Sequence, residues 1–188
     1  MFEQMDQRSF IHRTDADGKI CYVNAAWLAF AAENGWGAGT SQALGSELMA
    51  SITDLQTRHI YGLLMNRVRE SGRPVRFSFR CDSPDCRRLM EMQMRYDRVL
   101  QEFEFCSRAL HIERRETMPL LDASRATPSI ETLSVCSWCK AVLAEHAWIE
   151  VEQALIRLRL FAADALPQIS HGICPACSVR LRHVAVSV

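Results

Sequence analysis

Two Cys-x-x-Cys pairs near the end of the sequence constrain its fold more than any other feature. The first pair is Cys136 and Cys139, and the second is Cys174 and Cys177. Each pair lets two thiolates reach one ion from a single tight turn, and both together supply the four sulfur ligands of a tetrahedral structural zinc site. Because residues 131–188 alone can bury little apolar surface, a bound metal would supply much of their folding free energy.

The segment between the two pairs carries its own helical pattern. Apolar residues recur there at helical spacing, at Val151, Leu155, Leu158 and Ala162. Such a helix can fold the long excursion and bring the two pairs together. We therefore predict one zinc site rather than two separate reactive turns.

The residues alone leave open three alternatives to a zinc ion bound by four cysteines. His171, shortly before the second pair, can replace one cysteine as a ligand or donate a hydrogen bond to a thiolate. A redox dithiol is the second alternative, because a Cys-x-x-Cys pair is reactive when the pKa of one thiol is lowered. An iron–sulfur cluster also uses four thiolates. Zinc is preferred because neither pair lies in a βαβ pattern and two equivalent pairs suit one metal ion.

Composition bears on compartment and partners. Basic and acidic residues number 22 each, so the chain as a whole has no field to attract nucleic acid or acidic lipid. No apolar run approaches the length of about 18 residues that a membrane helix needs. The start, Met1 to Arg8, has acid where a signal peptide needs a basic head. We expect a cytoplasmic protein with reduced thiols and no membrane partner.

The first part of the chain shows the patterns of an α+β fold. Apolar and polar residues alternate over 75–81, 90–96 and 99–105, which predicts three antiparallel strands with one covered face. A longer helix is predicted over 51–70, where apolar residues recur on one side. The order of elements is thus short strands, then helices, then a three-stranded meander.

A short motif precedes these elements. Asp15-Ala16-Asp17-Gly18-Lys19-Ile20 forms a turn that enters a strand, and Tyr22-Val23-Asn24-Ala25-Ala26 leads into a helix with Asn24 as its N-cap. With this motif and order of elements, residues 9–115 resemble a PAS domain. The resemblance implies a five-stranded antiparallel sheet cupping helices on one face. It also implies a sensory or dimerising module, and some members of the family hold a ligand.

The cysteine-rich segment has a resemblance of its own. The residues Cys136-Ser137-Trp138-Cys139-Lys140, Trp148 and Ser170-His171-Gly172-Ile173-Cys174-Pro175-Ala176-Cys177 resemble cysteine-rich tails that follow sensory or receiver domains in bacterial signalling proteins. We expect a PAS-like domain over 1–115, a linker over 116–130, and a small, helical zinc module over 131–188.

An apolar set in the first part offers two interpretations. These side chains can line a pocket for a small-molecule ligand of unknown identity, or they can fill the core. The candidate pocket residues are Trp27, Phe30, Met49, Ile52, Leu64, Phe77, Phe79, Met92 and Met94. For a haem ligand, His59 is the best candidate among the histidines, and a hydrogen-bonded surface histidine is the favoured alternative.

Two further features have plain interpretations. Arginines are frequent between Arg58 and Arg88, and a solvated face is favoured there over a nucleic-acid site, so nucleic acid is not an expected partner. Cys81 and Cys86 flank a predicted turn and form either a reversible disulfide or two ordinary thiols.

These observations favour a non-catalytic bacterial signalling module, since a four-cysteine site is coordinatively closed. We expect a homodimer, formed through a sheet face or through Phe2, Met5 and Phe10, that acts on other signalling proteins. The alternatives are a redox switch, in which the cysteine pairs release metal and form disulfides, and a nucleic-acid-binding transcription regulator.

Overall fold

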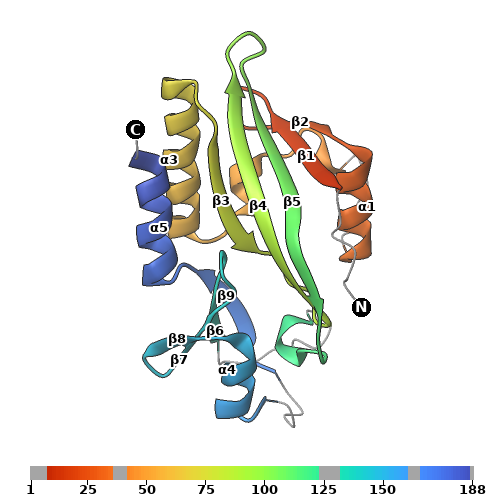
Figure 1. The fold of residues 1–188 in the computed structure, drawn as a ribbon, viewed down its shortest axis with the longest axis vertical. Helices are drawn as coiled ribbons and strands as arrows, with labels where there is room; N and C mark the ends of the chain where they lie inside the picture. Colours follow the sequence, from red (N-terminus) through yellow and green to blue (C-terminus); the bar gives the residue numbers. More distant parts are fainter. Residues whose placement is uncertain (1–7, 36–41, 123–131, 161–165, 187–188) are drawn as a thin grey trace.

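The computed structural model describes residues 8–35, 42–122, 132–160 and 166–186. Its larger sheet is five-stranded and antiparallel throughout, which confirms the expected α+β fold class (Figure 1). In spatial order its strands are β2 (Ile20–Val23), β1 (Ser9–Thr14), β5 (Glu102–Arg114), β4 (Cys86–Asp97) and β3 (Val75–Arg80).

One face of this sheet is apolar because its strands alternate with period two. Met90, Met92 and Met94 on β4 are buried, and Phe103 and Phe105 on β5 lie on the same face. The strands predicted over 75–81 and 90–96 are confirmed as β3 and β4, whereas β5 begins at Glu102, three residues later than the 99–105 pattern predicted. The opposite face carries ion pairs between neighbouring strands, such as Arg108 with Glu91 at 2.9 Å and Arg13 with Glu104 at 2.9 Å.

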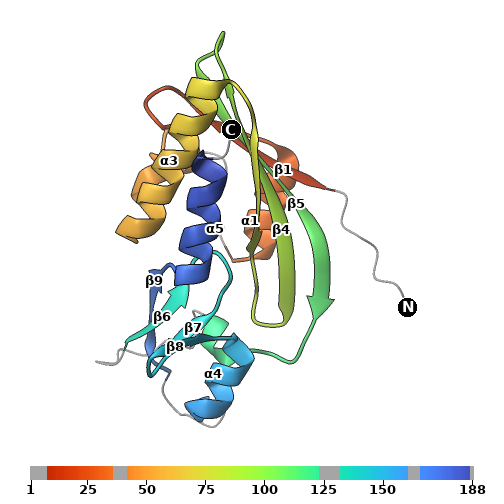
Figure 2. The same ribbon diagram turned by 60° about the vertical axis from the view of Figure 1, so that its left-hand side comes forward.

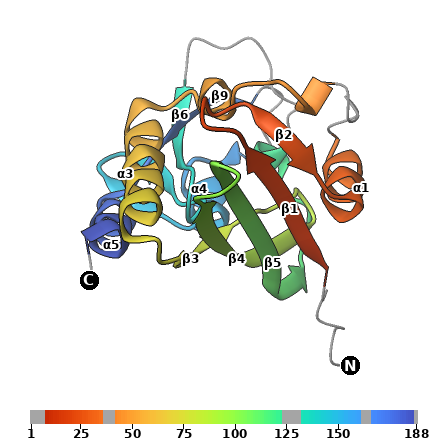
Figure 3. The same ribbon diagram turned by 90° about the horizontal axis from the view of Figure 1, so that it is seen from above.

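Helices α1 (Ala25–Glu33) and α3 (Leu55–Ser71), with the short 3-10 helix η1 (Leu48–Ser51), cover the apolar face (Figure 3). Asn24 caps α1 as predicted, since its side chain accepts from the Trp27 amide at 2.8 Å. Helix α3 begins four residues later than predicted, because Asp54 caps it by accepting from the Thr57 amide at 2.6 Å.

The C-terminal part contains a second sheet that the sequence did not reveal. Its strand order is β8 (Ala147–Ile149), β7 (Val142–Ala144), β6 (Thr132–Cys136) and β9 (Gln168–Gly172). Helix α4 (Val151–Arg157) starts at Val151, as the helical spacing predicted, but it ends before Leu158, and Ala162 lies outside the described residues. Helix α5 (Pro175–Val186) runs beside α3 (Figure 2).

The main hydrophobic core contains residues from both parts of the chain. Ile60, Leu64 and Met94 of the first part share it with Trp138 and Leu181 of the second. A smaller core lies under α4 and includes Met118 and Leu120, near the short 3-10 helix η2 (Pro119–Leu121). The start of the expected linker is thus packed, and 123–130 lie outside the described residues. The boundaries at 115 and 131 stay a prediction.

A ring of ion pairs also joins the two parts. Arg80 and Arg115 both pair with the fully buried carboxylate of Asp82, the latter at 3.1 Å. Arg115 and Arg87 each reach Glu152 of α4 at 2.6 Å. Arg80 and Arg87, which belong to the arginine-rich stretch between Arg58 and Arg88, are therefore engaged in ion pairs within the chain.

The structure bears on the expected dimer contact at the N-terminal segment and on membrane-spanning helices. Phe10 cannot offer an exposed dimer contact, because its side chain is 3% exposed and its ring lies 4.6 Å from that of Phe30. Phe2 and Met5 lie outside the described residues. Among the helices described, none is long and apolar enough to cross a membrane.

Candidate metal centre and adjoining cavity

The four paired cysteines meet in space. The Sγ atoms of Cys136, Cys139, Cys174 and Cys177 all lie within 4.8 Å of one another, and three of the four residues are buried. The Cys139 and Cys174 Sγ atoms are 3.7 Å apart. The excursion between the pairs therefore returns to close one four-sulfur cluster, which could hold a metal ion.

The first cysteine pair lies on the tight turn between β6 and β7. Lys140 takes the left-handed conformation, with φ 62°, and its amide donates to the Cys136 carbonyl at 3.0 Å. The Cys136 amide in turn donates to the Ala141 carbonyl at 2.8 Å. These bonds fold the backbone back after Cys139, so both thiols point to the same side of the turn.

The second pair lies at the junction between the end of β9 and the start of α5. Strand β9 runs parallel to β6 with Gly172 opposite Cys136, so both pairs stand at the same end of the small sheet. The Cys177 amide donates to Cys174 Sγ at 3.4 Å, and the Cys174 amide donates to Cys136 Sγ at 3.4 Å. These donors favour the thiolate form that a metal requires.

The cluster thiols lie so close together that the protonation of one changes the pKa of its neighbours. Hydrogen bonds from Cys139 and Cys177 hold the pKa of Cys136 far below its ordinary value. The same bond to Cys136 raises the pKa of Cys139 to about 11, and the pKa of Cys177 is raised as well. Four thiolates this close repel one another, so a cation that neutralises them fits the site.

His171 stands apart from the sulfur cluster. It lies at the surface on β9 opposite Val135. Partial desolvation of its ring is the largest cause that lowers its pKa, and the nearby Lys140 charge is the second. Within the described residues, the metal-competent cluster consists of the four cysteines. His171 instead lines a cavity next to the cysteine turn.

Trp138, between the two cysteines of the first turn, anchors that turn in the main core. Its side chain is 3% exposed, and its ring stacks on Tyr61 of α3 and meets the edge of Phe77 of β3, each at 5.3 Å between centroids. The sequence did not single out Trp138 as a functional residue. Its place between the two cysteines of the turn is the signal that could have done so.

A cavity of about 350 Å³ lies beside this tryptophan. Its walls come from β1, η1, the start of α3, the end of β3 and the cysteine turn. Its lining includes His12, Asp54, Thr57, Tyr61, Phe79, Arg80, Trp138, Lys140 and His171. The cavity is therefore shared between the larger sheet and the cysteine turn.

The structure distributes the nine candidate pocket residues over several places. Ile52 and Phe79 line this cavity. Phe30 lines a smaller one of about 210 Å³ near α1, and the Trp27 ring lies 6.3 Å from that of His12. Met49 is half-buried. The remaining members belong to the main core: Leu64, Phe77, Met92 and Met94.

His12 is the histidine that meets the cavity, whereas His59 is exposed on α3. The His12 ring stacks on Phe105 at 4.6 Å between centroids, with the planes inclined by 3°. Burial lowers the pKa of His12 to about 4, so the ring is neutral near pH 7. Cys81 and Cys86 are free thiols that line different cavities.

Comparisons with known proteins find similarity to solved structures alone. No protein-family model matches the sequence, and no curated protein matches it. Among solved structures, the chain is similar to the PAS domain of an HTR-like protein from Haloarcula marismortui, with 21% identity, a TM-score of 0.35, and coverage of 56% of this chain and 90% of that chain. It is also similar to a sensory box sensor histidine kinase from Vibrio cholerae, with 9% identity, a TM-score of 0.42, and coverage of 57% and 85% respectively.

Proposed function

We propose that this chain is a non-catalytic bacterial signalling module in which a PAS-like sheet domain is joined to a structural zinc site formed by Cys136, Cys139, Cys174 and Cys177. The observation that carries the proposal is the closed cluster of four Sγ atoms, all within 4.8 Å of one another, beside a core shared with the sheet domain. The metal would fix the cysteine turn, and the turn would fix Trp138 against α3 and β3.

The sulfur geometry supports zinc. With Zn–S bonds of about 2.3 Å, a tetrahedral site places its sulfurs about 3.8 Å apart. The Cys139 and Cys174 Sγ atoms are already 3.7 Å apart. Four thiolates leave no open position for water or substrate, so the metal would serve structure rather than catalysis. His171 is not needed as a ligand in this arrangement.

The signalling role rests on the sequence motifs and on where the metal centre lies. The Asp15–Ala26 motif and the five-stranded sheet support a sensory or dimerising module. The metal-binding turn packs against the helix side of that sheet, so a ligand or partner event there would reach the C-terminal module directly. We propose a homodimer that passes its signal by contact to another signalling protein, without nucleic acid.

Native mass spectrometry of protein purified without added metal or chelator tests this function. The expected result is one zinc per chain in a dimer. A metal-free chain with disulfides between the cysteine pairs would contradict the structural site and favour a redox switch. Cys174→Ser should lose the metal, whereas Cys106→Ser, remote from the cluster, should keep one zinc per chain.

A further inference from the structure

We propose that metal occupancy of the cysteine cluster controls whether the outer edge of strand β3 is covered by the C-terminal module, which comprises β6 to α5. This proposal deepens the proposed function, on which it rests, by assigning the metal site a regulatory contact within the same chain. In the strand order of the described residues, β3 stands at one edge of the larger sheet. A bare edge strand presents N–H and C=O groups to which another strand can pair.

Both cysteine pairs lie next to a residue that contacts this edge. Close to the first pair, the Trp138 carbonyl accepts a hydrogen bond from the Arg80 amide at 2.6 Å. Close to the second pair, Arg180 of α5 donates to the Ser78 carbonyl at 3.0 Å and to the Ser78 hydroxyl at 2.9 Å. Ser78 and Arg80 are two residues apart on β3, so their backbone groups point to the same edge. The module therefore takes the place of a neighbouring strand there.

Arg180 faces the sulfur cluster as well as the sheet. Its Nη2, which donates to the Ser78 carbonyl, also lies 3.9 Å from Cys177 Sγ. A divalent cation bound by four thiolates has a net negative charge, which attracts a guanidinium. Without the cation, the crowded thiolates repel one another and take up protons, so this attraction becomes weaker. Bound metal would therefore help to hold Arg180 where it contacts both Cys177 and Ser78.

The metal would also join the two edge contacts into one unit. Trp138 lies between Cys136 and Cys139, and Arg180 lies three residues after Cys177. An ion bound by both pairs fixes both contacts at once, and metal binding supplies much of the folding free energy in small modules of this kind. Without the ion, each contact must hold its part of the module on β3 alone.

The opening should be local, because only part of the module depends on the metal. Helix α5 buries Cys177, Leu181 and Ala185, and the first of these is a proposed ligand. Helix α4, by contrast, is joined to the larger sheet by the ring of ion pairs around Asp82, through Glu152, and has a second core beneath it. Loss of metal should therefore release the cysteine turn and α5 from β3 while α4 stays attached.

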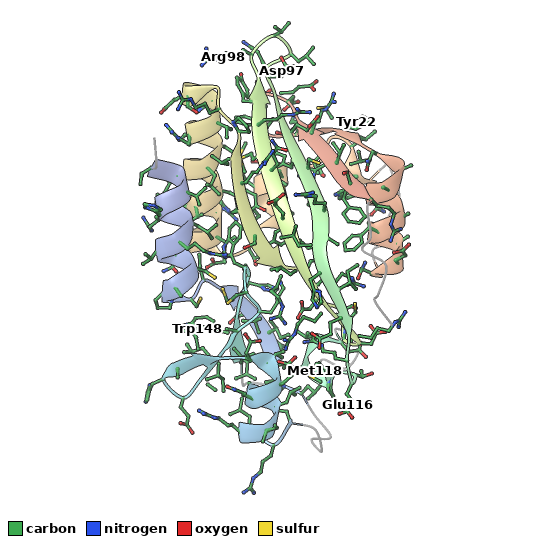
Figure 4. The ribbon with its side chains drawn as sticks, viewed as in Figure 1. Tyr22, Asp97, Arg98, Glu116, Met118 and Trp148 are labelled. Atoms are coloured by element: carbon green, nitrogen blue, oxygen red, sulfur yellow. The ribbon has the colours of Figure 1, made fainter. Side chains whose placement is uncertain are left out.

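Amide hydrogen exchange followed by mass spectrometry tests the proposal on the full chain, with metal bound and after chelation. Exchange should rise over β3 and α5 when the metal is removed, and zinc added back should restore protection. Exchange should stay unchanged over β1 and β2, which form the opposite edge of the sheet, where Tyr22 lies (Figure 4).

Arg180→Gln tests the link between cluster and edge without altering a cysteine. It removes the charge and the donors to Ser78, so exchange over β3 and α5 should rise about ten-fold even with metal bound. Zinc should stay at one per chain. Arg182→Gln is the matched control, because Arg182 contacts Ser178 of its own helix at 3.4 Å, and this variant should exchange as the parent protein does.

Zinc content measured on the same samples separates the two proposals. Protein that holds one zinc per chain, and whose exchange over β3 is the same before and after chelation, would overturn the metal-dependent cover and leave the structural site in place. An equal rise at both edges of the sheet would show global unfolding and would overturn the cover too. Protein that binds no zinc would contradict the proposed function and the cover with it.

Discussion

Trp138 stacks on Tyr61 with their ring centroids 5.3 Å apart, and this contact ties the cysteine turn to helix α3. Both rings belong to the main core, which α5 also enters through Leu181. Tyr61→Ala should therefore destabilise the whole chain by about 2–4 kcal/mol, because a large ring leaves a cavity at the junction. Denaturant unfolding would measure this. Tyr22→Ala, at a residue 43% exposed on β2, should cost less than about 1 kcal/mol.

The buried carboxylate of Asp82 forms ion pairs with two arginines, so removing its charge should lower the stability of the protein. Asp82→Asn leaves Arg80 and Arg115 with less opposing charge in a region where both are largely buried. We expect a loss of about 3–5 kcal/mol in the free energy of unfolding. Asp85→Asn, whose exposed carboxylate lies 3.7 Å from Arg114, should change stability by less than about 0.5 kcal/mol. Equal losses of stability in the two variants would contradict a structural role for the ring of ion pairs around Asp82.

His12 should make stability depend on pH below neutrality. Burial lowers its pKa from 6.5 to about 4 in the folded protein, so the unfolded chain binds the proton more readily. The contribution of neutral His12 is present above about pH 6.5 and is lost as the pH falls toward 4. The loss is on the order of 2–3 kcal/mol. Urea unfolding at pH 7 and pH 5 would measure part of it.

The matched variants for this pH effect are His12→Phe and His59→Gln. His12→Phe keeps a ring against Phe105 and removes the titrating group, so the fall in stability below pH 6.5 should become smaller. His59→Gln changes an exposed histidine and should leave the pH dependence as it is. An undiminished dependence in His12→Phe would assign the effect to other groups.

Metal should protect the cluster thiols from alkylation. With metal bound, iodoacetamide should label exposed Cys21 before Cys136 or Cys177, which are buried and would be ligands. A chelator should then make the cluster cysteines reactive, because the free thiols are no longer held as metal thiolates. Peptide mass spectrometry would locate the labels. Labelling of Cys177 at the rate of Cys21 in metal-loaded protein would contradict a closed site.

Local pattern was enough to predict the larger sheet and its first helix. The alternation along β3 and β4 depends only on which residues face the core, and Asn24 caps α1 through a bond to an amide three residues away. The start of α3 was missed by four residues because Asp54 competes as a cap with earlier residues. The grouping of the four cysteines followed from their spacing, and the structure brings them together.

Long-range contacts account for what the sequence did not show. Strands β7 and β8 span three residues each, too few to show an alternation of apolar and polar residues. Strand β9 pairs in parallel with β6, which lies more than thirty residues earlier in the sequence. The His12 ring packs on Phe105 because β1 pairs with β5. His59, which its sequence neighbours favoured, is exposed to solvent. The cavity likewise depends on how the cysteine turn docks on α3.

The central claim is that one zinc ion is held by four cysteine sulfurs at the junction with the sheet domain. X-ray absorption at the zinc edge tests it most directly, because the ligand shell distinguishes sulfur from nitrogen. We predict a single shell of four sulfurs at about 2.3 Å. A mixed shell of three sulfurs and one nitrogen would place His171 or another nitrogen on the metal and contradict the closed four-cysteine site.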